Sequence, residues 1–205
     1  MVNPGFEDPQ GFTAYPVTLA SGPGGTSGVD QGWALFGAAS RSDMSNSVDG
    51  PFAGSYSLLV QNTPGNNWNP AGAYQIISGA MPGIVYTFSC SFLTDTGTAY
   101  GTPVELAIGF QDANPDDPFL GAGLVGNWQV IPDNHSWYQG SVTATAPPGA
   151  VNVAVFVLFM DNGQTSTENV YFDNAAIPTI PEPSGPALVG VGLAVSACRT
   201  RRRIC

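Results

Sequence analysis

Two tryptophans of this sequence lie among amide side chains, where they could bind a ligand. Trp68 lies in the Asn-rich segment 66–69, and Trp128 lies between Asn127 and Gln129. A flat indole packs well against the C–H face of a sugar ring, and neighbouring amides can bond its hydroxyls. The sequence therefore predicts a glycan contact at both tryptophans. The alternative is that each ring only pins its own loop.

Residue combinations that could carry out catalysis are few. The single histidine, His135, precedes Ser136, but a Ser-His arrangement also needs a third group and an oxyanion site, and the sequence has no Gly-x-Ser-x-Gly. Asp116 and Asp117 could act as an acid and a base, yet they are adjacent in a Pro-rich segment where carboxylates cap turns. We expect a solvated loop histidine and a protein that is not an enzyme.

The charge of the chain excludes one class of partner. The sequence has no lysine, and Arg41 is the only basic side chain before residue 199, against 15 Asp and Glu in the whole chain. Affinity for nucleic acid depends on Lys and Arg neutralising phosphates. We therefore expect no nucleic acid partner, whereas cations and neutral polymers remain as candidates.

Cysteine usage excludes further classes of site. Cys90 is the only cysteine before the tail, which holds Cys198 and Cys205, so no disulfide can form within the body. Cys90 lies in an alternating apolar run and is predicted to be a small buried hydrophobe. There are too few thiols for a metal cluster or a redox motif.

Apolar alternation and turn residues predict an all-β body. Short strands are expected at residues 33–36, 55–60, 73–77, 84–93, 104–110, 141–145, 151–160 and 169–173. The run 151–160 has almost no polar interruption, so we expect it to be central and buried on both faces. Residues 63–71 and 112–133 are expected to be loops, and Trp33 and Trp137 to lie in the core.

No segment has sustained helical periodicity. We therefore expect eight to ten antiparallel strands in a two-sheet jelly-roll sandwich over residues 1–176, followed by a separate segment over residues 177–205.

That last segment combines three features in order. Pro181-Glu182-Pro183-Ser184 precedes an apolar run over 187–197, and a basic cluster follows that includes Arg201, Arg202 and Arg203. The arrangement resembles the PEP-CTERM sorting signal. The resemblance implies a short apolar helix, cleavage by an exosortase-type membrane protease and attachment to an envelope or matrix. The alternative is a disordered tail.

The apolar run is shorter than the ~20 residues that span a bilayer. We therefore expect transient presentation to the inner membrane rather than permanent anchoring. The resemblance implies an exported protein of a Gram-negative cell envelope, outer surface or extracellular matrix. Residues 1–3 do not have the basic and apolar regions of an export signal, so export would require a start upstream of Met1.

The body carries a second resemblance. The pieces that carry it are Asn-Pro-Gly-Phe-Glu at 3–7, Gly-Ser-Tyr-Ser-Leu at 54–58, Tyr-Gln at 74–75, Pro-Gly at 82–83, Ala-Pro-Pro-Gly-Ala-Val at 146–151 and Tyr-Phe-Asp-Asn at 171–174. In this order they are similar to carbohydrate-binding modules of families 4 and 9, which are galactose-binding-like jelly rolls. The resemblance implies a polysaccharide or exopolysaccharide as partner.

The resemblance also implies a structural calcium ion where the chain ends meet. Its carboxylate ligands would be Glu7 and Asp173. Ca²⁺ takes about six to eight oxygens, so backbone carbonyls around residues 49–55 and water would complete the site. The alternative is a pair of strand-end carboxylates that accept hydrogen bonds from the backbone.

The favoured hypothesis is thus an exported, calcium-stabilised, non-catalytic glycan-binding protein. A structural envelope or matrix component without a sugar site is the second hypothesis. A glycosidase or esterase built around His135 is the third.

Overall fold

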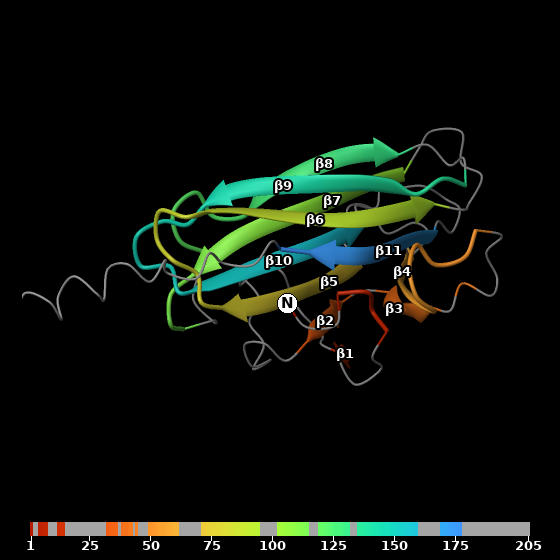
Figure 1. Ribbon diagram of the computed structural model, residues 1–205, viewed down its shortest axis with the longest axis horizontal. Coiled ribbons are helices and arrows are strands. Elements are labelled where there is room, and N and C mark those ends of the chain that lie inside the picture. Colours follow the sequence, from red (N-terminus) through yellow and green to blue (C-terminus); the bar gives the residue numbers. More distant parts are fainter. Residues whose placement is uncertain are drawn as a thin grey trace, which may run out of the picture.

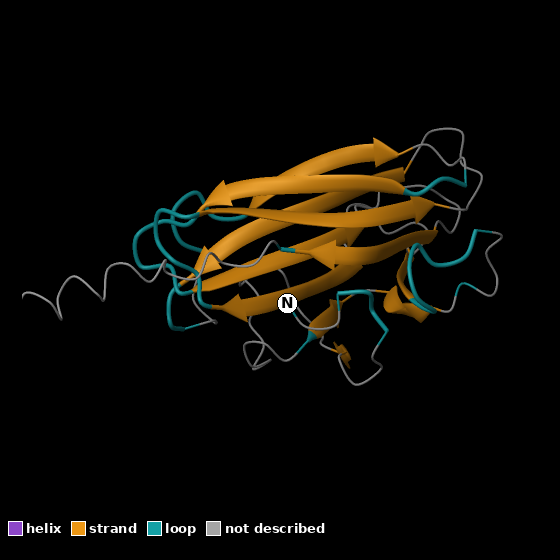
Figure 2. Cartoon of the chain, in the orientation of Figure 1, coloured by secondary structure: helices purple, strands orange, loops and turns teal. Residues whose placement is uncertain are grey.

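The computed structural model describes residues 1, 4–7, 12–14, 32–36, 38–42, 44, 49–61, 71–94, 102–114, 119–131, 135–159 and 169–177. These residues form strands and loops without a helix (Figure 2). No helix long and apolar enough to cross a membrane therefore occurs in this part of the chain. Trp68 and the predicted sorting segment from residue 178 onward lie outside the described residues.

Eleven described strands build two sheets packed face to face (Figure 1). One sheet has the order β1-β2-β5-β10-β7-β8, and the other has the order β3-β4-β11-β6-β9. The strands are β1 (Phe12–Ala14), β2 (Trp33–Phe36), β3 (Ala38–Ser42), β4 (Ser57–Gln61), β5 (Ala71–Ser78), β6 (Val85–Thr94), β7 (Thr102–Gln111), β8 (Val125–Ile131), β9 (Tyr138–Thr145), β10 (Asn152–Phe159) and β11 (Asn169–Ala176). The predicted jelly-roll sandwich is confirmed. Its pairing is antiparallel except between β1 and β2, which run parallel.

The core between the sheets follows the sequence pattern. All eight residues of β10 are buried, because β5 and β7 flank this strand and both its faces are covered. Trp33 is fully buried, as predicted. Cys90 is buried and forms no disulfide. Burial raises the pKa of its thiol, whose S–H donates to the Asp173 carbonyl at 3.2 Å.

The six-stranded sheet also carries apolar residues on its outward face. Phe36, Tyr74, Phe156 and Phe119 form a row of aromatic contacts across β2, β5, β10 and the loop before β8. The ring centroids of Tyr74 and Phe156 are 5.4 Å apart in a stacked arrangement. The row is buried at β2, β5 and β10 and ends beside β7 and β8, where the face becomes exposed.

Two sequence predictions about local structure were wrong. The segment 112–133 is not one long connection, because it contains β8. The alternation of apolar and polar residues that predicts a strand is broken here, because the inward position 127 holds an asparagine. Its side chain donates to the Ser141 carbonyl of β9 at 2.7 Å. Trp137 is half-buried rather than in the core, and its indole N–H donates to the Gly50 carbonyl at 3.3 Å. In addition, β1 and β3 were not predicted.

Candidate functional site

The opening turn places Glu7 beside the end of β11. Phe6 has a φ of 58°, a left-handed conformation that is unusual for a bulky residue. This conformation lets the Phe6 ring turn inward onto Trp33, with ring centroids 5.0 Å apart, while Glu7 stays at the surface. The Pro4 carbonyl accepts a hydrogen bond from the Ala175 amide at 2.9 Å. The N-terminal segment is thereby tied to the last strand.

A bulge directs the second carboxylate to the same place. The pairing of β11 with β6 shifts register between Asp173 and Ala176, and Asn174 has a φ of 50°. Asn adopts this region more readily than most residues because its short polar side chain can bond locally. The Asn174 amide donates to Asp173 Oδ1 at 2.6 Å. Bulges commonly re-aim a side chain next to a functional site.

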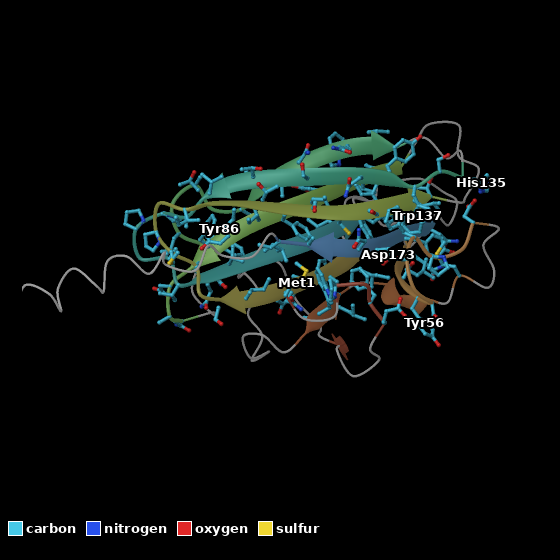
Figure 3. All side chains as sticks on the ribbon, in the orientation of Figure 1. Met1, Tyr56, Tyr86, His135, Trp137 and Asp173 are labelled. Atoms are coloured by element: carbon cyan, nitrogen blue, oxygen red, sulfur yellow. The ribbon has the colours of Figure 1, made fainter. Side chains whose placement is uncertain are left out.

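Residues 49–56, which we call the anchored loop, join the two carboxylates. The Ala53 amide donates to Asp173 Oδ2 at 3.0 Å. The amides of Ser55 and Tyr56 donate to Glu7 Oε1 at 3.0 and 3.1 Å. Figure 3 shows Asp173 toward the end of the sandwich that carries His135 and Trp137, opposite the end at Tyr86.

Two glycines lie around this pair, and one of them is required. A Cβ at Gly5 would lie in ordinary contact, 3.8 Å from Asp173 Oδ1 and 3.9 Å from Glu7 Oε1, so both carboxylates face the space beside it. A Cβ at Gly54 would collide with the Glu7 carboxylate, and the φ of 69° there also favours glycine. Glu7 and Asp173 thus lie close together, and both accept backbone hydrogen bonds, as the alternative interpretation of this pair expects.

The electrostatics of the pair favour a cation. Asp173 is fully buried, and burial raises the pKa of its carboxyl above the usual range. Hydrogen bonds from Ala53, Asn174 and Ser57 lower this pKa, whereas the Glu7 carboxylate raises it. A bound cation would relieve both the burial of charge and the mutual repulsion.

An orphaned hydroxyl lies next to the pair. Ser91 on β6 is the register partner of Asp173, and its Oγ is buried without a hydrogen-bond partner in the described part of the chain. A buried polar atom without a partner needs a physical explanation, and a bound ion is one of them.

The residues present fit calcium. From the residues that the structure describes, Asp173 Oδ2 and Glu7 Oε1 each accept two hydrogen bonds, whereas Asp173 Oδ1 and Glu7 Oε2 each accept one and could also bind a metal ion. Hard oxygen donors suit Ca²⁺. Within the described residues no group of three or more His, Cys, Asp or Glu could hold a metal. Glu7 and Asp173 would therefore be the charged ligands, with backbone carbonyls and water supplying the rest.

The histidine lies at the far side of the anchored loop. His135 has a φ of 55°, and its Nδ1 is 2.9 Å from Asp49 Oδ2. The imidazole is half exposed, which agrees with the predicted solvated loop histidine. Phe52 packs edge-on against Trp137, with centroids 5.6 Å apart. These contacts fasten the loop that holds the carboxylates.

The second candidate site is a surface that we call the Trp128 face: Trp128 and Val130 of β8 with Glu105 of β7. Trp128 is 53 % exposed and is the register partner of Glu105, so both side chains lie on the outward face of the six-stranded sheet. The Glu105 carboxyl lies directly over Gly126, where any Cβ would clash with it. Burial raises the pKa of Glu105. An exposed indole thus lies beside a carboxyl group held in place by β8.

Sequence reasoning found Trp128 but gave it the wrong surroundings. It was predicted in a polar loop with amide neighbours, whereas it lies on an edge strand and its cross-strand neighbour is Glu105. Nothing in the local sequence of Glu105 connects it with Trp128, because the two are 23 positions apart. The glycine at 126 was the available signal, since glycine inside a strand often marks a close approach.

No protein-family model matches the sequence, and none of the curated proteins is significantly similar to it. Solved structures are similar in fold. The carbohydrate-binding module TmCBM61, in complex with β-1,4-galactotriose, has a TM-score of 0.51 at 14 % identity over 88 % of this chain and 97 % of that one. A putative sugar-binding protein from Bacteroides thetaiotaomicron has a TM-score of 0.50 at 12 % identity over 75 % of this chain and 90 % of that one.

The enzymatically active domain of tailspike protein 4 from bacteriophage CBA120 also has a TM-score of 0.50, at 15 % identity. The match covers 69 % of this chain but only 18 % of the phage protein. At identities of 12–15 %, structural similarity supports a shared fold and does not indicate a shared function. The chain thus has the jelly-roll β-sandwich fold found in these proteins.

Proposed function

We propose that the chain is a non-catalytic glycan-binding β-sandwich whose contact surface is the Trp128 face. The observation that carries the proposal is the 53 % exposure of Trp128 on a sheet face with the Glu105 carboxyl beside it. A large indole left in water on a rigid strand costs solvation free energy, which a ligand that stacks on the ring would recover.

The chemistry of the surface suits a sugar. The indole offers a flat apolar face to ring C–H groups, and the carboxyl of Glu105 can accept hydrogen bonds from hydroxyls. Both side chains are on strands, which hold a site more rigidly than loops. Two solved proteins of the same fold are described as binding β-1,4-galactotriose and as a putative sugar-binding protein. That fold-level analogy supports the proposal and does not specify the glycan.

The charge of the chain favours a neutral glycan. The formal net charge is −10 at pH 7, so an anionic polysaccharide would be repelled over the range of the Debye length. We therefore expect β-1,4-galactan or xylan to be preferred over alginate at low salt.

Replacement of Trp128 by alanine should abolish retention on a neutral glycan without unfolding the protein. We expect the affinity to fall by about tenfold or more, because the stacking surface is removed. Glu105→Gln should weaken binding less, since it retains a hydrogen-bonding group. Affinity electrophoresis in gels that contain β-1,4-galactan, xylan or alginate would measure the retardation, and Trp68→Ala would be run alongside to test the other predicted tryptophan.

Phe52→Ala is the matched control. Phe52 is 48 % exposed, close to the value for Trp128, but it lies on the anchored loop. Its loss should leave retention unchanged, and all variants should melt close to the wild type. If no neutral glycan retards the wild type, or if Phe52→Ala weakens binding as much as Trp128→Ala, the structural-component hypothesis replaces this one.

We propose in addition that Glu7 and Asp173 hold a structural calcium ion. The convergence of two carboxylates beside Gly5, the burial of Asp173 and the orphaned Ser91 hydroxyl support this proposal. The ion would fasten the N-terminal turn, the anchored loop and the end of β11 to one another.

Export and sorting remain proposals that rest on the sequence of residues 181–203. We propose that an exosortase-type protease removes the tail in a host that has this machinery. Mass spectrometry of envelope and secreted fractions should then find mature chains that end near Pro183. Peptides that retain Arg201-Arg202-Arg203 in every fraction would contradict this cleavage.

A further inference from the structure

The described strands leave four edges in the sandwich, and β8 is a seven-residue edge strand with exposed apolar side chains. Natural sheets blunt their edges with short strands, charges, prolines, bulges or covering segments. β1 has only three residues, and β3 has five. The edge strand β9 is bridged by the Asn127 side chain, which donates to its Ser141 carbonyl. These three edges therefore have some protection against pairing with another chain.

β8 has none of these protections within the described residues. It pairs with β7 over seven consecutive residues without a register shift. The strand Val125–Ile131 contains no charge and no proline. Trp128 and Val130 are 53 % and 56 % exposed on its outward face, and Leu124 before it is exposed as well. In Figure 1 the strand lies along the upper margin of the sandwich.

The neutral sequence of β8 permits a second copy of the chain at this edge. A chain with a formal net charge of −10 repels itself wherever its carboxylates meet. β8 itself is free of charge, and so is β9 behind it, whereas Glu105 of β7 places one carboxyl over Gly126 in each copy. A new antiparallel pair at β8 would satisfy the edge amides and carbonyls.

The sequence of β8 is complementary to itself under twofold symmetry. Antiparallel pairing centred on Trp128 places Gly126 opposite Val130, Asn127 opposite Gln129, and Val125 opposite Ile131. Glycine faces valine, amide faces amide, and a branched apolar residue faces another. Both copies of Trp128 lie at the axis on the same face, because directly opposed residues of a pair point the same way.

We propose that β8 pairs with β8 of a second copy in this register, which joins two six-stranded sheets into one continuous sheet. The contact is isologous and closes as a dimer. One seven-residue strand from each copy gives an interface below the standard size of about 1,600 Å², so the association is weak and depends on concentration. This assembly does not depend on glycan binding, although it would align two Trp128 faces on one surface.

The twofold register makes a charge test possible. It brings Val130 of one copy against Gly126 of the other, and the Glu105 carboxyl lies over that glycine. A glutamate at position 130 would meet this carboxyl and be repelled, whereas a lysine would attract it. Val85 provides the matched control, since it is 60 % exposed but lies on β6, which β11 and β9 flank on both sides.

Sedimentation velocity of the full chain over about two orders of magnitude in concentration would measure the dimer. The wild type, Val85→Glu and Val85→Lys should show the same monomer–dimer equilibrium. Val130→Glu should weaken dimerisation by about tenfold or more, and Val130→Lys should strengthen it. Thermal melts would show that the fold is intact. A wild type that stays monomeric, larger species in place of a dimer, or equal dimerisation of Val130→Glu and Val130→Lys would overturn the proposal.

Discussion

Replacement of Trp33 by alanine should lower the free energy of unfolding by about 3–5 kcal/mol, the range for a buried aromatic removed from a packed core. The side chain is fully buried between the sheets and contacts Phe6. It therefore supports both the core and the turn that positions Glu7. Urea unfolding followed by circular dichroism would give the free energy, and an unchanged slope would show that the folded state is otherwise preserved.

Trp128→Ala is the control for this effect. The two substitutions delete the same atoms, but Trp128 is 53 % exposed, so its loss should change the stability by no more than about 0.5 kcal/mol. Equal losses for the two variants would mean that Trp128 is part of the packing. The Trp128 face would then be unavailable to a ligand.

Calcium should raise the melting temperature of the wild type. A ligand at about 100 times its dissociation constant stabilises the native state by about 2.7 kcal/mol, which corresponds to roughly 5–11 °C for a chain of this size. EDTA should reverse the rise, and magnesium should produce less of it, because Mg²⁺ demands a stricter octahedral geometry. Differential scanning calorimetry with each ion would measure the shift.

The carboxylate variants locate the effect. The calcium-dependent rise should vanish in Glu7→Gln, in Asp173→Asn and in the double variant, and it should persist in Glu105→Gln, whose carboxyl is on the other sheet. The melting temperature of each variant with calcium is compared with that of the same variant in EDTA. A lower basal stability of the variant therefore does not affect the calcium-dependent difference. If Asp173→Asn does not fold, Glu7→Gln remains, because Glu7 is exposed. A wild type that melts at the same temperature with calcium and with EDTA would exclude the site.

Some of this structure could be read directly from the sequence. The uninterrupted apolar run became the central strand β10, and the alternation of Tyr86, Phe88, Cys90 and Phe92 became one buried face of β6. Both signals are local, because strand periodicity and burial on two faces leave their pattern in consecutive residues.

The sequence by itself determined the sandwich and the scarcity of basic residues before residue 199, and a family resemblance pointed to Glu7 and Asp173. Tertiary structure alone decided their geometry. The left-handed Phe6, the bulge after Asp173 and the anchored loop act together over more than 100 positions, and no short window records such a contact.

The same holds at β8. Its inward amide bonds to β9 and its outward tryptophan faces solvent beside Glu105, which reverses the apolar-inward pattern that identifies a strand in sequence. The period of apolar residues along the sequence indicates only which side chains tend to be buried. Only the arrangement of the two sheets decides whether an edge position meets a partner strand, a side-chain amide or water.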